Sequence, residues 1–260
     1  MTTAVAVRQT IALTKRSTLA IARQPALLAP SLVFPLFFAA LSASSFSKTT
    51  RLPGFPKVDS FLQFSLASTV IQGVLFGSVS GAAALATDIE IGFFDRLLAS
   101  PTSRTGILIG NLMGSALFGA AQSAVFIGAL LPFGVRVEAG IPGILIMIVA
   151  GGLIALGIAS LMSSVAIRTG SAESVQGTFP LLFVLLFFSS AFFPRETMHG
   201  IYKRIADLNP ISYLVEGLRS LVLDGFSMSA ISRSIIVPIG ICVVGIAFAL
   251  SELRRKIRAQ

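Results

Sequence analysis

Six long stretches of this sequence carry no charged side chain, and they restrict its fold more than any other feature. They cover residues 24–47, 60–87, 105–135, 139–167, 174–194 and 234–251. A transmembrane helix needs about 20 mostly apolar residues, and each stretch is near or above that length. Strands of a membrane barrel would be about ten residues long with alternating polarity, and these stretches do not alternate. We therefore predict an all-α, polytopic membrane protein, a single domain over residues 1–260 with six transmembrane helices.

The charged residues lie between and beyond these stretches. They make up 12% of the chain, which is too few to cover the surface of a soluble protein. Six crossings place both termini on one side, and lysine and arginine are dense beside the first crossing and in the C-terminal tail. The positive-inside rule makes that side cytoplasmic. The net charge of +9 fits phospholipid headgroups at the plasma membrane, so we expect membrane lipids and no nucleic acid as partners.

Residues 1–25 precede the first crossing and have the pattern of an interfacial helix. At about 100° per residue, one face carries the basic side chains Arg8, Lys15, Arg16 and Arg23. The opposite face carries Val7, Ile11, Thr14, Thr18 and Ile21. A helix with two such faces lies at the level of the lipid headgroups. A loose basic tail is the alternative.

Two of the predicted transmembrane helices carry glycine at every fourth position. The second has Gly73, Gly77 and Gly81, and the third has Gly106, Gly110 and Gly114. Such a stripe lets helix backbones approach closely in lipid. The pattern predicts a packing partner for each helix, either another helix of this chain or a second copy of the chain.

A short charged segment separates the second and third predicted crossings on the cytoplasmic side. Thr87 and Glu90 have the spacing of a capping box, and Asp88 would add negative charge to the first helical turn. Pro101 would end the helix, and Gly92 leaves a low point on its surface. The pattern predicts a short cytoplasmic helix that can contact a soluble partner. A solvated connector is the alternative.

Residues 195–233 are too polar to cross the membrane and predict a helical hairpin on the outer side. Asn209-Pro210 is typical of a helix start. Apolar residues then recur at helical spacing, which predicts an amphipathic helix on the outer membrane face. On its surface, Glu216 and Arg219 are three positions apart and can form an ion pair. A shorter helix is expected before it.

The chain lacks residues that would drive chemistry or transport alone. It has one His and one Cys, so neither a metal cluster nor a Ser-His-Asp set is available. It has no nucleotide-binding P-loop. It also has no ionisable residue deep in a predicted crossing, where ion-coupled carriers usually keep one. The Phe-rich stretch 174–194 serves in packing or lines a path for an apolar solute. Energy for uphill transport would have to come from another chain.

Two motifs resemble those of the membrane subunits, or permeases, of ABC-2-type ABC transporters, in the branch that includes daunorubicin-resistance exporters. The first comprises Asp88, Glu90, Gly92, Asp95, Arg96, Pro101, Ser103 and Arg104, followed by Gly110. The second runs from Ser189 to Met198 and continues with Asn209-Pro210 and Leu218-Arg219. The family often has Pro where this chain has His199, and a basic residue where it has Asn111.

The resemblance implies that the segment 88–104 forms a coupling helix that docks on a separate ATPase subunit. The contact residues would be Asp88, Glu90, Gly92, Asp95 and Arg96. It implies a complex of two ATPase subunits, which would bind ATP and Mg²⁺, and two permeases, identical or different. This chain would itself hold no cofactor.

The implied function is export of an amphipathic or lipid-like solute, such as a drug, an antibiotic or a glycolipid. The alternative solute within this family is a polysaccharide or a lipid-linked glycan. Alternatives from other classes are an ion-coupled carrier, a membrane-embedded enzyme acting on lipid, and a structural scaffold. The sequence does not distinguish among the solutes.

Overall fold

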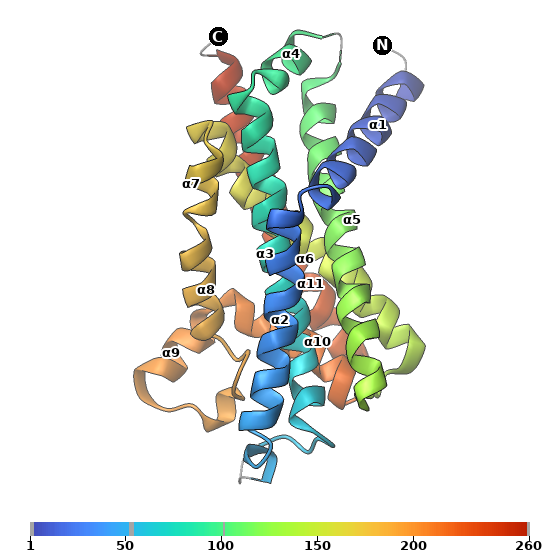
Figure 1. Ribbon diagram of the computed structural model, residues 1–260, viewed down its shortest axis with the longest axis vertical. Coiled ribbons are helices and arrows are strands. Elements are labelled where there is room, and N and C mark those ends of the chain that lie inside the picture. The colour runs from blue at the N-terminus through green and yellow to red at the C-terminus, as the bar shows by residue number, and fades with distance from the viewer. Residues whose placement is uncertain (1–2, 52–54, 101, 259–260) are drawn as a thin grey trace.

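The computed structural model describes residues 3–51, 55–100 and 102–258, and the regular elements in these ranges are helices (Figure 1). In chain order they are α1 (Thr3–Ala22), α2 (Pro25–Ser45), η1 (Thr49–Arg51), α3 (Phe61–Glu90), α4 (Phe93–Ala99), α5 (Arg104–Leu130), η2 (Leu131–Phe133), α6 (Gly140–Thr169), α7 (Ala172–Gln176), α8 (Phe179–Phe187), η3 (Arg195–Thr197), α9 (Gly200–Leu208), α10 (Pro210–Leu223) and α11 (Met228–Arg258). The start of α1, α4 and the end of α11 lie at one end of the molecule, here called the terminal end, and α9 lies at the other.

Five of the described helices are long and apolar enough to cross a membrane. They are α2, α3, α5 extended by η2, α6 and α11. In the most apolar part of α3, 89% of the residues are buried, compared with 22% in α2 and 28% in α11. Helix α3 is therefore the core of the bundle, and the exposed apolar sides of α2 and α11 are the sides that lipid would cover. The all-α, polytopic class predicted from the uncharged stretches is confirmed.

The apolar stretch 174–194, predicted as the fifth crossing, is not one continuous helix. It contains α7 and α8, separated at Gly177 and Thr178, and α8 ends at Phe187. The chain beyond α8 is stabilised by side chains from the following hairpin: Asn209 donates to the Leu185 and Phe188 carbonyls at 2.6 and 3.0 Å. These bonds satisfy carbonyl groups that a helix end leaves unpaired. The number of six crossings stays a prediction.

Both glycine stripes face helices of the same chain. A Cβ added to Gly81 would meet Ser115 of α5, and the other two glycines of α3 face Gln122 and Phe126 of α5. The stripe on α5 faces α1 instead. There, a Cβ on Gly110 would lie 2.6 Å from the Leu13 Cβ, and one on Gly114 would lie 2.6 Å from the Ser17 Cβ; Gly106 faces Thr10. The close approaches are therefore made between α3, α5 and α1.

The N-terminal arm, predicted over residues 1–25, is helical from Thr3 to Ala22 and lies along α5. Ser17 and Thr18 donate hydrogen bonds to the carbonyls of Asn111 and Gly114, at 3.3 and 3.5 Å. Thr18 of the predicted apolar face thus contacts α5, as does its neighbour Ser17, whereas Val7 and Ile11 of that face are exposed. Arg8, Lys15, Arg16 and Arg23 are also exposed. A position at the membrane surface stays a prediction for this helix.

Helix α10 does not lie on the outer surface, contrary to the prediction. Its apolar side chains pack against α3 and α11, and Leu214, Val215 and Leu218 are at most 1% exposed. Arg219 falls on this buried face because it follows Val215 by four positions. The expected Glu216–Arg219 surface pair does not form. Glu216 instead forms an ion pair with Arg195, and Arg219 donates to the carbonyls of Phe64 and Ala191, at 3.4 and 3.1 Å.

Candidate functional site

The charged segment at the terminal end forms a sharp turn between two helices. Helix α3 continues through Glu90, and Thr87 donates to the Ala83 carbonyl as an interior residue, so the predicted capping box is wrong. The chain reverses at Gly92, whose φ of 69° favours glycine, and α4 begins at Phe93. Helix α4 ends at Ala99. The predicted stop, Pro101, lies outside the described residues.

Asp88 connects the end of α3 to the N-terminal helix. Its carboxylate accepts two hydrogen bonds of 2.7 Å from Arg16. An acid in the last turn of a helix is disfavoured by the helix dipole, and the guanidinium compensates for this. The hydrogen bond from Arg16 to Asp88 raises the pKa of Arg16, so the cation stays charged. The same guanidinium lies 4.0 Å from the centre of the Phe93 ring, which brings α1, α3 and α4 together.

Glu90 connects the end of α3 to α7. One of its carboxylate oxygens accepts a hydrogen bond of 2.7 Å from the backbone N–H of Ala172, the first residue of α7. A carboxylate at this position satisfies an N–H that the helix leaves unpaired. Glu90 thus adds a hydrogen bond to the packing between α3 and α7.

Asp95 connects α4 to the C-terminal end of α11. The Lys256 ammonium lies 3.4 Å from the Asp95 carboxylate and 5.5 Å from the Phe94 ring centre. Phe94 is only 1% exposed and fixes α4 to the bundle. Helix α4 is thus held by α1 on one side and by α11 on another.

The outer side of this turn is exposed, and we call it the α4 face: Glu90, Ile91, Gly92 and Arg96. The Ile91 side chain is 63% exposed. A Cβ on Gly92 would meet no described atom within 4 Å, so the surface beside Ile91 is open. Arg96 is exposed and lies 5.9 Å from the Phe93 ring centre. The α4 face thus exposes one apolar side chain beside an acidic and a basic one.

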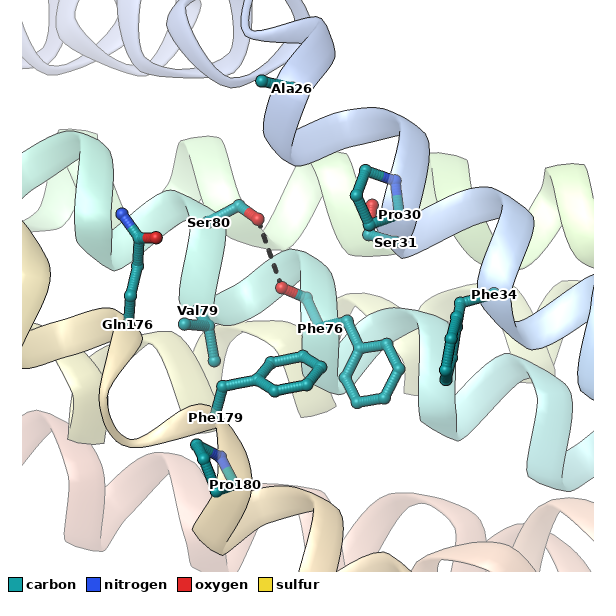
Figure 2. Close-up of a pocket in the computed structure, with 10 residues that line it drawn as sticks. All are labelled: Ala26, Pro30, Ser31, Phe34, Phe76, Val79, Ser80, Gln176, Phe179 and Pro180. Atoms are coloured by element: carbon teal, nitrogen blue, oxygen red, sulfur yellow. Dashed lines mark hydrogen bonds between the residues drawn. The ribbon is translucent and has the colours of Figure 1, made fainter.

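A cavity of about 500 Å³ lies between α2, α3 and the α7–α8 region (Figure 2). Phe34, Phe76 and Phe179 supply aromatic rings from three helices, and the Phe76 and Phe179 ring centres are 4.5 Å apart. Ser80 and Gln176 add polar groups. None of the ten described residues that line the cavity is ionisable. The chemistry of this lining suits an amphipathic molecule with apolar or aromatic parts.

A row of phenylalanines continues from this cavity toward the other end of the molecule. Ring centres are 6.2 Å apart from Phe179 to Phe183, 4.7 Å from Phe183 to Phe187 and 4.8 Å from Phe187 to Phe192. Phe38 of α2 lies 6.4 Å from Phe192. The Phe-rich stretch thus faces α2, and it forms one wall along the cavity side of α8.

The α4 face and the cavity are connected through α7. Glu90 binds Ala172 at the start of α7, Gln176 at its end lines the cavity, and Phe179 begins α8. Movement of the turn therefore has a short covalent and hydrogen-bonded route to the cavity wall. Sequence reasoning missed Ile91, Phe93 and Lys256. Ile91 and Phe93, apolar residues within a charged segment, carried a local signal, whereas Lys256 carried none.

Comparison with known proteins gives a family match and several relatives. The ABC-2 type transporter family matches residues 8–223. The daunorubicin resistance ABC transporter permease protein DrrB1 of Streptomyces coeruleorubidus is 32% identical over 198 residues, which cover 74% of this chain and 65% of that protein. The probable doxorubicin resistance ABC transporter permease protein DrrC of Mycobacterium tuberculosis is 24% identical over 186 residues, covering 72% and 67%. The putative transport permease ycf38 of Cyanophora paradoxa is 28% identical over 221 residues, covering 83% and 74%. The chain thus spans less than two thirds of DrrB1.

Proposed function

The chain belongs to the ABC-2 type transporter family, and from this we propose that it is the membrane permease subunit of an ATP-driven exporter. Two relatives are named as permeases of daunorubicin or doxorubicin resistance transporters, and we extend that role to this chain. The observation that carries the proposal is the connection of an exposed apolar and charged face, around α4, to the cavity between α2, α3 and α8 through Glu90 and α7.

The proposed partner is an ABC ATPase that docks on the α4 face. Two ATPase subunits would bind ATP and Mg²⁺ and act on two permeases, which are identical or different copies. Ile91 would insert into the ATPase surface, with Glu90 and Arg96 giving charge complementarity at the rim. The terminal end would then lie on the cytoplasmic side of the plasma membrane, together with both termini and the interfacial helix α1.

The proposed solute is amphipathic or lipid-like, with a drug as the first candidate. The cavity offers the aromatic rings of Phe34, Phe76 and Phe179, which suit planar apolar groups. The alternative solute, a polysaccharide or lipid-linked glycan, needs many hydrogen bonds and, for a diphosphate linkage, cationic partners. The described lining has neither lysine nor arginine. An ion-coupled carrier is less favoured still, because a coupling ion needs an ionisable or charged site.

In the proposed mechanism, ATP-driven closure of the ATPases moves the α4 face. Arg16 and Lys256 carry that movement to α1 and α11, and Glu90 carries it to α7 and α8. The cavity wall formed by Phe179 would shift against α2. A solute held in the cavity would then be released toward the opposite end, along a path between the two permeases.

The test uses two matched substitutions in the complex with the partner ATPase. Ile91→Ser and Ile141→Ser replace isoleucines that are 63% and 74% exposed, on the α4 face and at the start of α6. Loss of a central apolar contact lowers affinity by about tenfold. We expect Ile91→Ser to reduce ATPase co-purification and daunorubicin-stimulated ATP hydrolysis, and Ile141→Ser to change neither. Normal coupling in a folded Ile91→Ser variant would refute the docking role.

A further inference from the structure

Helix α9 carries an apolar stripe that this chain leaves uncovered. The stripe consists of Ile201, Ile205 and Leu208, which follow one another at helical spacing and are 74%, 39% and 86% exposed. Within this nine-residue helix, Ala206 on another side is the buried residue that faces the protein. Figure 1 shows α9 beside the bundle, at the end opposite α4.

Two basic side chains flank the stripe. Lys203 and Arg204 are exposed, and neither forms an ion pair with a residue that the structure describes. The nearby acid, Asp207, has Arg195 3.5 Å from its carboxylate. At about 100° per residue, Lys203, Asp207 and Arg204 lie on one side of the helix, and Arg204 borders the apolar stripe at Leu208. With two basic residues and one acid, this side has a net positive charge.

The tyrosines give an independent indication of the environment of α9. The chain has two tyrosines and no tryptophan, and the tyrosines lie on α9 and at the start of α10. Tyr202 and Tyr213 are 36% and 41% exposed. Tyr202 donates a hydrogen bond to the Phe187 carbonyl, and Tyr213 donates to the Asp207 carbonyl at 2.7 Å. Amphipathic aromatic rings concentrate where hydrocarbon meets water.

We propose that α9 lies in the interfacial layer of the leaflet opposite the terminal end and binds anionic phospholipids there. Ile201, Ile205 and Leu208 insert among the acyl chains, and Lys203 and Arg204 contact headgroup phosphates. Lipid is the occupant because α9 lies beside a bundle of helices that are long and apolar enough to cross a membrane, and because the unpaired charges on α9 are positive. The inference requires only that the chain spans a membrane; it is independent of the export proposal.

This contact would fix the outer end of α8. The Tyr202 hydroxyl binds the carbonyl of Phe187, the last residue of α8, so α9 and α8 move together. The Phe188 ring centre lies 5.4 Å from that of Tyr202 and extends the apolar surface toward the bundle. Anionic lipid would thereby stabilise the end of the phenylalanine row.

Because the wild-type chain has no tryptophan, Leu208→Trp introduces a single fluorescent reporter. The full chain would be reconstituted in vesicles of phosphatidylcholine and phosphatidylglycerol with bromines near the top of the acyl chains. We expect bromolipid to quench this tryptophan by about half, and aqueous iodide to quench it weakly. The control, Ile91→Trp at the terminal end, should be quenched strongly by iodide and weakly by bromolipid. Iodide quenching without bromolipid quenching, or shielding from both by a second protein chain, would overturn the proposal.

The headgroup preference is tested with Lys203→Gln and Arg204→Gln in the same reporter chain. The matched control is Lys57→Gln with Arg136→Gln, which removes the same charge from exposed positions outside α9. Bromines would be carried on the phosphatidylglycerol or on the phosphatidylcholine in separate samples. We expect the parent and the control to be quenched about twofold more by brominated phosphatidylglycerol, and the α9 variant to lose this difference. Equal quenching by the two lipids in the parent would exclude anionic lipid binding.

Discussion

Arg16 and Asp88 are 72 positions apart, and their side chains form two hydrogen bonds of 2.7 Å. The pair attaches the N-terminal helix to the end of α3, the most buried helix of the bundle. Its position beside Phe93 makes α1 part of the same unit as the α4 face. In an exporter, α1 would therefore move with the docked ATPase.

Breaking this pair should loosen α1. The Arg16 side chain is 41% exposed, so the pair contributes at most about 1 kcal/mol. Arg16→Ala and Asp88→Ala should each speed cleavage within α1 severalfold, measured with a protease that cuts at apolar residues. The exchange variant, Arg16→Asp with Asp88→Arg, should recover much of the protection. Cleavage of every variant at the wild-type rate would mean that packing against α5 alone holds α1.

The Lys256–Asp95 contact predicts a role for the C-terminal end of α11 in coupling. Lys256→Glu places a negative charge beside the Asp95 carboxylate, now 3.4 Å from the ammonium. We expect solute-stimulated ATP hydrolysis to fall severalfold while the basal rate stays unchanged. Arg254→Glu is the control, because Arg254 is exposed and has no ion pair among the described residues. Equal effects of both changes would indicate a general charge effect on the tail.

The α1–α5 packing predicts sensitivity at Gly114. A Cβ there would lie 2.6 Å from the Ser17 Cβ and 3.0 Å from the Thr18 backbone nitrogen. Gly114→Ala should lower the free energy of unfolding by about 1–3 kcal/mol, measured as a lower thermal midpoint in detergent. Gly128→Ala is the matched change, since its Cβ would meet no described atom within 4 Å. A midpoint equal to that of Gly128→Ala would show that α1 can move away freely.

Arg219 should be important for stability, although it is remote from both the α4 face and the cavity. It is 6% exposed, its guanidinium lies 3.8 Å from the Phe64 ring centre, and it binds Ser68 at 3.2 Å. Arg219→Met keeps the bulk but removes the donors, which should cost about 1–3 kcal/mol for the unpaired carbonyls. Arg233→Met, at an exposed position of α11, should change the thermal midpoint little. A small effect at both positions would mean that water replaces the guanidinium.

Local patterns predicted the long helices but not their junctions. The uncharged stretches anticipated α3, α5 and α6 because burial in lipid excludes charge whatever the tertiary contacts. The capping-box pattern at Thr87 did not mark a helix start because α3 extends through it to Glu90. Within the stretch 174–194, α8 ends at Phe187, where Asn209, far along the chain, binds the Leu185 and Phe188 carbonyls. Such partners come from the tertiary fold.

The candidate site, too, could be predicted only in part from local sequence patterns. The charged segment and Gly92 marked the α4 face from the sequence, because a polar turn between two apolar helices has to lie outside the lipid. The sequence could not assign Asp88 to Arg16 or Asp95 to Lys256, since surface charges at many positions would pair equally well. Likewise, the apolar stripe of α10 predicted which side is buried, and it could not specify whether protein or lipid covers it.

The cavity predicts how the solute is selected. Phe76→Ala removes a ring that is 4.5 Å from Phe179 and 6.3 Å from Phe34, so a planar solute loses its aromatic contacts on α3. A single aromatic contact contributes about 0.5–1.5 kcal/mol, which corresponds to a severalfold rise in the solute concentration that half-stimulates ATP hydrolysis. The maximal rate should change less, because the α4 face is intact. Phe133→Ala, at a ring 75% exposed beyond α5, is the control. If daunorubicin stimulates Phe76→Ala and Phe133→Ala at the same concentration, the cavity does not bind the solute, and the path lies elsewhere between the permeases.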